Sequence, residues 1–238
     1  MKNVFYSLAF AASVFLVNGQ LLAQHNDIEF GYDSGQIFLV TGELTDSSSD
    51  AHRIFEANFP ITGTFARYTD DPGFFSEVAE GLGVGPNDLI GLDVVQSGNF
   101  GSFLTYFDPT TMIISSTGAV ITLDNGVSSL EITGTTGGLQ AIAEADGVGN
   151  IHDHIDFYLS EGAASGAYGI LFKMTSDDVS IGNSEPVWLV FNHGMEEAVF
   201  DSKALAAFGK FSAVPEPGSA VLLGMIGLAM FGTRRNRS

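Results

Sequence analysis

Short apolar stretches alternate with turn signals along most of the chain, and this pattern predicts β-strands rather than helices. Glycine-containing turns separate the stretches, and the strongest hairpin signal is Asp124-Asn125-Gly126, which lies between two alternating segments. The segments predicted as strands are 27–32, 37–41, 61–68, 90–95, 103–107, 112–115, 119–123, 129–133, 155–159, 167–175 and 187–191. We therefore expect an all-β domain, an antiparallel β-sandwich.

One short helix is predicted at 195–208. Glu196 and Glu197 lie in its first turn, where they complement the helix dipole, and Gly209 suits the position just after its end. The helix would place Val199, Leu205 and Phe208 against the sandwich.

The N-terminus has the organisation of a secretory signal peptide. Lys2 precedes an apolar run at 4–17, and Leu21-Leu22-Ala23 ends the segment with a small residue. We expect cleavage after Ala23, so that residues 1–23 form the signal helix and the mature domain occupies 24–210.

The C-terminal segment, 211–238, combines three features. Pro215, Glu216 and Pro217 form a turn, an uncharged apolar run follows at 218–232, and arginines end the chain at positions 234, 235 and 237. A basic end after an apolar helix favours a cytoplasmic C-terminus. The run is shorter than the ~20 residues of a permanent spanning helix, so we expect transient membrane insertion.

Composition narrows the function classes. The chain has 9 Lys+Arg against 28 Asp+Glu, a formal net charge of −19, and no cysteine. A surface this acidic repels nucleic acid, which we exclude as a partner. The lack of cysteine excludes disulfides, thiolate metal sites and cysteine nucleophiles.

Two alternating segments place histidines and carboxylates together. In a strand, His152, His154 and Asp156 would share one face, and at the start of the mature domain His25 and Asp27 would do the same, together with Glu29. If two such strands pair, His25, Asp27, His152 and His154 supply the nitrogen and oxygen ligands of a divalent metal. The alternative is an ordinary solvated strand face. His52 and His193 have no such partners in the sequence.

No catalytic motif is present: the chain lacks the nucleophile elbow, the zinc-protease helix motif, the phosphate loop and the dinucleotide fingerprint. We therefore expect a non-enzymatic protein, although a carboxylate pair for glycoside hydrolysis stays open. A structural or carbohydrate-binding matrix protein without a metal site is the alternative function. Exposed aromatic rings would favour it, but the lone Trp188 lies in a segment that reads as buried.

The C-terminal arrangement of Pro215, Glu216 and Pro217, a short helix, and Arg234, Arg235 and Arg237 resembles the PEP-CTERM sorting signal of Gram-negative bacteria. The resemblance implies export through the Sec translocon, transient insertion in the inner membrane, and cleavage by an exosortase near the Pro-Glu-Pro motif. It further implies release to the cell surface or extracellular matrix, where extracellular polysaccharide is a candidate partner.

A second resemblance covers several short motifs of the mature domain: His25-x-Asp27-Ile28-x-Phe30, Asp70-Asp71-Pro72-Gly73-Phe74, 149–154 and 186–192. These look like bacterial surface-anchored proteins controlled by the zinc-uptake repressor. This likeness implies zinc as the metal, with His25, Asp27, His152 and His154 as candidate ligands.

Overall fold

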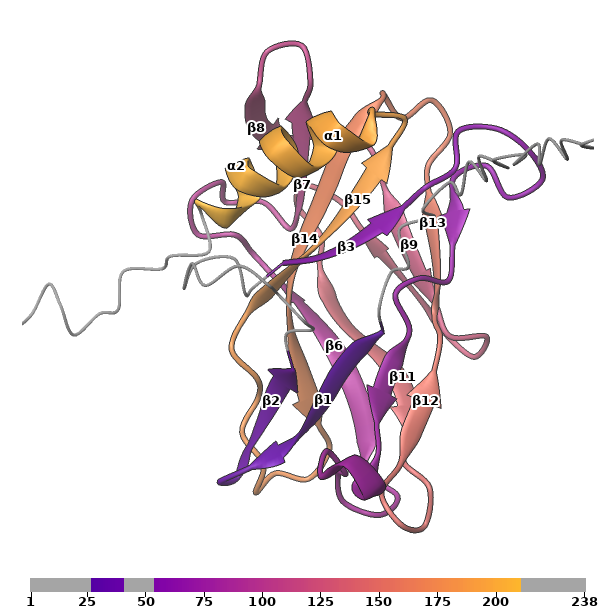
Figure 1. Ribbon diagram of the computed structural model, residues 1–238, viewed down its shortest axis with the longest axis vertical. Coiled ribbons are helices and arrows are strands. Elements are labelled where there is room, and N and C mark those ends of the chain that lie inside the picture. The colour runs from indigo at the N-terminus through magenta and orange to yellow at the C-terminus, as the bar shows by residue number, and fades with distance from the viewer. Residues whose placement is uncertain (1–26, 41–53, 211–238) are drawn as a thin grey trace, which may run out of the picture.

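The computed structural model describes residues 27–40 and 54–210, and these form an all-β structure with one helical segment near the C-terminal end (Figure 1). The predicted fold class is confirmed at this level. The predicted signal helix, the sorting segment, His25 and His52 lie outside the described residues. Within the two described ranges, no helix has the length and apolar character needed to cross a membrane.

The strands form one large and two small sheets. The large sheet has the order β11-β6-β14-β15-β3, and β7 pairs with both β14 and β8. Its strands are β3 (Ile54–Asn58), β6 (Leu89–Val95), β7 (Leu104–Asp108), β8 (Ile113–Ser116), β11 (Gly138–Glu144), β14 (Gly166–Ser176) and β15 (Val187–His193).

The first small sheet has the order β12-β5-β1-β2, and the second has the order β10-β9-β13-β4. The first contains β1 (Ile28–Asp33), β2 (Gln36–Val40), β5 (Phe74–Ser76) and β12 (Ile151–Asp153). The second contains β4 (Tyr68–Thr69), β9 (Ile121–Asp124), β10 (Ser129–Ile132) and β13 (Asp156–Leu159).

The expectation of purely antiparallel sheets is wrong in two places. β1 runs parallel to β5, and β15 runs parallel to β3. Parallel neighbours need a crossover between them, and here the crossovers pass through other sheets. The architecture is therefore sandwich-like, with mixed and antiparallel sheets.

The central strands β14 and β15 are buried on both faces. All seven residues of β15 are buried, and β14 is buried at every position from Gly166 to Ile170. Alternate side chains of these strands enter two separate clusters, with Tyr168, Leu189 and Phe191 in the main core and Trp188 and Val190 in a smaller one. This explains why 187–191 reads as a continuous apolar run rather than an alternating one.

The helical segment covers the outer face of the large sheet (Figure 1). It consists of α1 (Glu197–Val199), a π-helical stretch at Phe200–Leu205 and α2 (Ala206–Gly209), which confirms the predicted helix. Phe200 and Phe208 are fully buried. Phe208 lies against Gly169 of β14, where a Cβ atom would come within 2.3 Å of the Phe208 ring, so the missing side chain lets the helix seat on the sheet.

Most predicted strands are found within two residues of their expected bounds, including the hairpin between β9 and β10. The strand predicted at 61–68 is wrong, because this segment forms turns up to Tyr68 and β3 lies before it. The predicted continuous segment 151–159 is also divided: β12 belongs to one small sheet and β13 to the other. Sequence reasoning missed β3, β5 and β11 as strands.

The buried His193 generates a prediction about acid stability. Burial lowers the pKa of His193 below 6.5, and the nearby Arg67 charge lowers it further, against the effect of a hydrogen bond to the Phe59 carbonyl. The folded state therefore holds a neutral ring, while the unfolded chain takes up a proton as the pH falls through 6.5. We expect the melting temperature to fall between about pH 7.5 and about pH 5.5, and a His193→Gln variant to show a smaller fall.

The carboxylates of Asp108, Asp146 and Asp178 do not interfere with this measurement. Backbone hydrogen bonds lower the pKa of each below 3.8, so their contributions are lost only at more acidic pH. Identical pH profiles for the two proteins in thermal unfolding monitored by circular dichroism would contradict the assignment to His193.

Candidate metal site

The candidate site lies at one end of the sheet β12-β5-β1, where three segments distant in sequence meet. Asp27 comes directly before β1, and His152 and His154 lie in and just after β12. β5 lies between these strands and pairs with both, in parallel with β1 and antiparallel with β12. The predicted direct pairing of the two ligand strands is thus wrong, but they still bring their side chains to one place.

Gly73 makes this meeting across the central strand geometrically feasible. The register pairs Phe74 with Ile28 on one side and Asp153 on the other, so Gly73 stands between Asp27 and His154. A Cβ atom on Gly73 would lie 2.5 Å from His154 Cε1 and 2.7 Å from Asp27 Oδ1. The absence of a side chain at this position leaves the space in which the two ligand side chains approach each other.

Phe75, two residues after Gly73 and on the same face of β5, carries a large side chain where Gly73 has none. Phe75 pairs with Glu29 on one side and His152 on the other, and its ring packs edge-on against the His152 imidazole at 5.5 Å between centroids. Glu29 is not part of the group, although it shares the strand face predicted for Asp27.

The ligand atoms of Asp27, His152 and His154 all lie within 4.8 Å of one another. His152 Nε2 lies 3.4 Å from Asp27 Oδ2. Two ligands of a tetrahedral zinc ion with bonds of about 2.0–2.1 Å stand roughly 3.3 Å apart, so this pair is already at the spacing that such an ion requires. The three residues thus form a group that could hold a metal ion.

Hydrogen bonds to the main chain orient two of the three ligands. His154 Nδ1 lies 2.8 Å from the carbonyl oxygen of Asp70. Because a carbonyl oxygen can only accept, Nδ1 carries the proton, and in the neutral ring Nε2 keeps a free lone pair. Asp27 Oδ1 accepts the Gly73 N–H at 3.1 Å, which leaves Oδ2 turned toward His152. Such supporting contacts are typical of metal-binding histidines and carboxylates.

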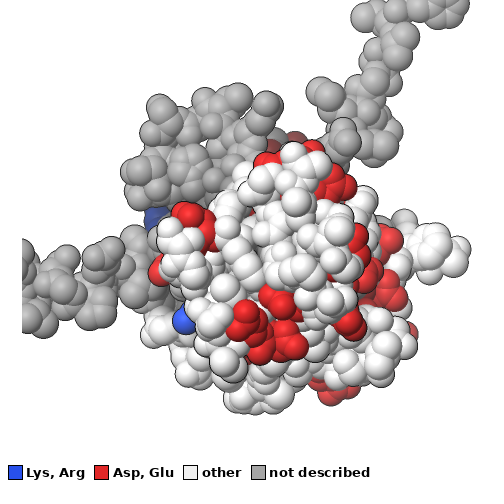
Figure 2. All heavy atoms as spheres, turned by 90° about the horizontal axis from the view of Figure 1, so that it is seen from below, with Lys and Arg blue, Asp and Glu red and all other residues white. Residues whose placement is uncertain are grey.

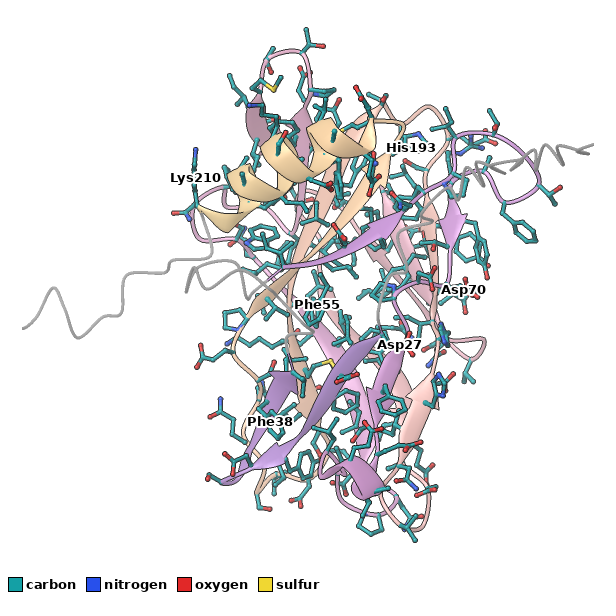
Figure 3. All side chains as sticks on the ribbon, in the orientation of Figure 1. Asp27, Phe38, Phe55, Asp70, His193 and Lys210 are labelled. Atoms are coloured by element: carbon teal, nitrogen blue, oxygen red, sulfur yellow. The ribbon has the colours of Figure 1, made fainter. Side chains whose placement is uncertain are left out.

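The site is open to solvent and lies in a strongly acidic surrounding. The side chain of His152 is 60% exposed and that of Asp27 is 27% exposed. Asp27 and the nearby Asp70 are labelled in Figure 3 on the same side of the molecule. Several patches of carboxylates also lie on the lower end of the molecule, where basic groups are few (Figure 2). A cation approaching this surface is therefore attracted before it meets any ligand.

The alternative interpretation of the pair is a simple ion pair between a protonated His152 and Asp27. At this exposure such a pair contributes little to stability, with a typical value of about 0–1 kcal/mol. It would also leave unexplained why a ring nitrogen of His154 lies within 4.8 Å of the ligand atoms of both Asp27 and His152.

The structure places the predicted site residues as follows. Asp27, His152 and His154 come together, and His25 lies outside the described residues. Asp156, predicted to share the histidine face, does not join them, because the strand breaks after Asp153 and Asp156 begins β13 in the other small sheet.

Sequence reasoning missed the supporting residues Asp70 and Gly73. The turn at 70–74 was recognised as a motif, but sequence alone did not place it between the two ligand strands. A glycine directly before an apolar Phe-Phe pair was the available signal, since glycine in a strand often marks a close approach.

No family model matches this chain. No curated protein matches it significantly either.

The geometry predicts that Gly73→Ala weakens metal binding while leaving the fold intact. The added methyl group would push the exposed His154 ring and the Asp27 carboxylate apart, and Gly73 does not need a left-handed φ, so the backbone tolerates alanine. We expect the Kd for Zn²⁺, measured by calorimetric titration, to rise at least about tenfold.

Gly118→Ala is the matched control, because a Cβ atom at Gly118 has no neighbour within 4 Å and its φ is also ordinary. Equal zinc affinity in both variants, with equal melting temperatures, would show that the space at Gly73 does not shape the site.

Proposed function

We propose that this chain is an exported, exosortase-processed surface protein whose β domain binds a divalent metal, zinc foremost, without a catalytic role. The observation that carries the metal-binding part is the convergence of Asp27, His152 and His154 from separate strands, with the His154 tautomer set by Asp70.

The chemistry of the ligands favours zinc over calcium or magnesium. Calcium and magnesium take oxygen ligands almost exclusively, whereas two imidazole nitrogens and one carboxylate oxygen suit zinc. When bound, the ion would take Nε2 of His152 and Oδ2 of Asp27, which lie 3.4 Å apart, and Nε2 of His154, the ring nitrogen that Asp70 does not engage.

Three protein ligands leave one position of a tetrahedral ion open. His25 stands two residues before Asp27, so an extended backbone would direct both side chains to the same face. We propose His25 as the fourth ligand, with water as the alternative. An exposed site of this kind suits reversible metal capture better than a closed structural centre.

The cellular location rests on the two ends of the sequence. The signal-peptide pattern at 1–23 and the Pro-Glu-Pro, apolar and arginine segments at 211–238 support export and sorting. We propose that the mature domain is released to the cell surface or extracellular matrix of a Gram-negative-type bacterium.

The metal proposal predicts the outcome of a zinc titration on the double variant His152→Ala/His154→Ala. Removing both imidazoles deletes two of the three ligands, so we expect the Kd for Zn²⁺ to rise by at least about a hundredfold. Isothermal titration calorimetry measures the change, and a parallel Ca²⁺ titration tests selectivity.

Glu131→Gln is the control for non-specific binding by carboxylates, because Glu131 is an exposed acid on β10 in the other small sheet. The control should keep wild-type zinc affinity. Weak, equal binding by all three proteins would remove the specific site and leave only an acidic surface.

The sorting proposal predicts that Glu216→Ala blocks processing of the C-terminal segment. The unprocessed chain should then stay in the membrane fraction of the cells that produce it, as shown by immunoblotting of fractions and by the larger mass of the retained form. Glu185→Ala, outside the motif, should be processed normally. Normal release of the Glu216 variant would overturn the sorting assignment.

A further inference from the structure

A second group of side chains, separate from the metal site, forms a row of aromatic rings on the surface. Phe65 and Tyr158 are 64% and 41% exposed. The Phe65 and Tyr68 ring centroids are 5.7 Å apart, and those of Tyr68 and Tyr158 are 5.1 Å apart. Exposed apolar side chains that lie in contact with one another, rather than singly, often mark interaction sites.

On the outer face of the sheet β10-β9-β13-β4, polar residues continue the surface beyond the aromatic rings. Tyr158 pairs in register with Tyr68 on one side and Thr122 on the other, and Thr122 pairs with Glu131. The outer face beside the rings therefore continues over four neighbouring strands spaced about 4.8 Å apart, with rings on β4 and β13 and polar side chains on β9 and β10. Its shape suits an extended ligand rather than a compact one.

The inner face of the same strands packs against the main core. Phe157, Leu159, Ile121 and Leu123 are buried in the main core. The outer aromatic rings are thus not needed to close this core, and their exposure calls for another explanation.

Asp156 gives the row a fixed polar centre. Tyr68 donates its hydroxyl to Asp156 Oδ1 at 3.0 Å, and Tyr158 donates to Oδ2 at 2.9 Å. The two bonds use about half of the acceptor sites of the carboxylate and leave the rest free for another donor. Burial and the hydrogen bond to Asp156 raise the pKa of Tyr68, and the hydrogen bond to Asp156 raises the pKa of Tyr158. Both phenols therefore keep their protons and donate to Asp156 at physiological pH.

The loop that carries Phe65 is held in place by main-chain hydrogen bonds. Arg67 N–H donates to the Pro60 carbonyl at 2.7 Å, and Tyr68 N–H donates to the Phe65 carbonyl at 3.1 Å. Leu159 N–H joins the end of this loop to β13 through the Arg67 carbonyl at 2.9 Å. A preorganised surface loses little conformational entropy when it binds a ligand.

This surface offers aromatic ring faces together with hydrogen-bond acceptors. A pyranose ring has the complementary form, with an apolar C–H face that packs on an aromatic ring and a rim of hydroxyl donors. We propose that the row of Phe65, Tyr68 and Tyr158, with Asp156 at its centre, binds a neutral polysaccharide of hexopyranose units. The proposal goes beyond metal binding and does not require a bound metal.

The negative charge around the aromatic row favours binding of a neutral polymer over an anionic one. Asp156 and Glu131 lie along the row, and the only nearby cation among the described residues, Arg67, faces Glu161 at 3.7 Å. The whole chain has a net charge of −19. A polyuronate would be repelled by this surface, whereas an uncharged chain would not.

The test is calorimetric titration of the full chain, without added metal, with cellohexaose, maltohexaose and a hexameric polyuronate. We expect one neutral hexasaccharide to bind and the polyuronate not to bind. Phe65→Ala should weaken that binding at least about fivefold, since it removes one exposed ring face. Asp156→Asn should also weaken it, because the amide retains only one acceptor oxygen.

Val127→Ala is the control, because Val127 is 92% exposed and lies in the β9–β10 turn, which carries no aromatic residue. Phe65 is itself mostly exposed, so its removal should leave the melting temperature unchanged and keep the result interpretable. Failure of both neutral oligosaccharides to bind would overturn the proposal, as would equal affinity of the Phe65→Ala variant or a preference for the polyuronate. None of these outcomes bears on zinc binding, so the two proposals fail independently.

Discussion

The double-sided burial of β14 and β15 is the constraint on which the rest of the structure depends. Strands that are apolar on both faces must be covered on both faces, because either exposed face would leave a row of large side chains in water. The helical segment covers one face through Phe200 and Phe208. The two small sheets contribute Phe30, Phe74 and Phe157 to the core on the other.

That covering role determines which side chains the small sheets show to solvent. Strand residues alternate, so committing Ile28 and Phe74 to the core sends their neighbours outward. In one small sheet the outward positions hold the candidate metal ligands, and in the other they hold Tyr68 and Tyr158. Both candidate binding surfaces are therefore the outer faces of elements whose inner faces complete the core.

The sequence predicted well what depends on local pattern. The alternation at 27–32 correctly placed Ile28 in the core and Asp27 toward solvent, and the Asp-Asn-Gly turn correctly joined β9 to β10. It also identified three residues that the structure brings together, Asp27, His152 and His154. These features are fixed within a few residues of chain, which is why a pattern can show them.

Features that depend on pairing between strands far apart in the chain could not be predicted from the sequence. The position of β5 between β1 and β12 joins segments more than forty residues apart, so neither the role of Gly73 nor that of the Asp70 carbonyl could be inferred. The aromatic row was missed for a similar reason. Segment 61–68 has the composition of a strand, but Gly63 and Arg67 take a left-handed φ and turn the chain, which leaves Phe65 exposed.

The spacing of the three candidate ligands along the chain has a mechanical consequence. Asp27 opens the described part of the chain, and His152 and His154 lie far beyond it, so an ion held by all three would cross-link the first strand to a distant one. Such a cross-link restricts the unfolded chain much as a disulfide does. In a chain with no cysteine, a bound metal would act as a reversible cross-link, and the concentration of free metal would set how firmly the N-terminal strand is held.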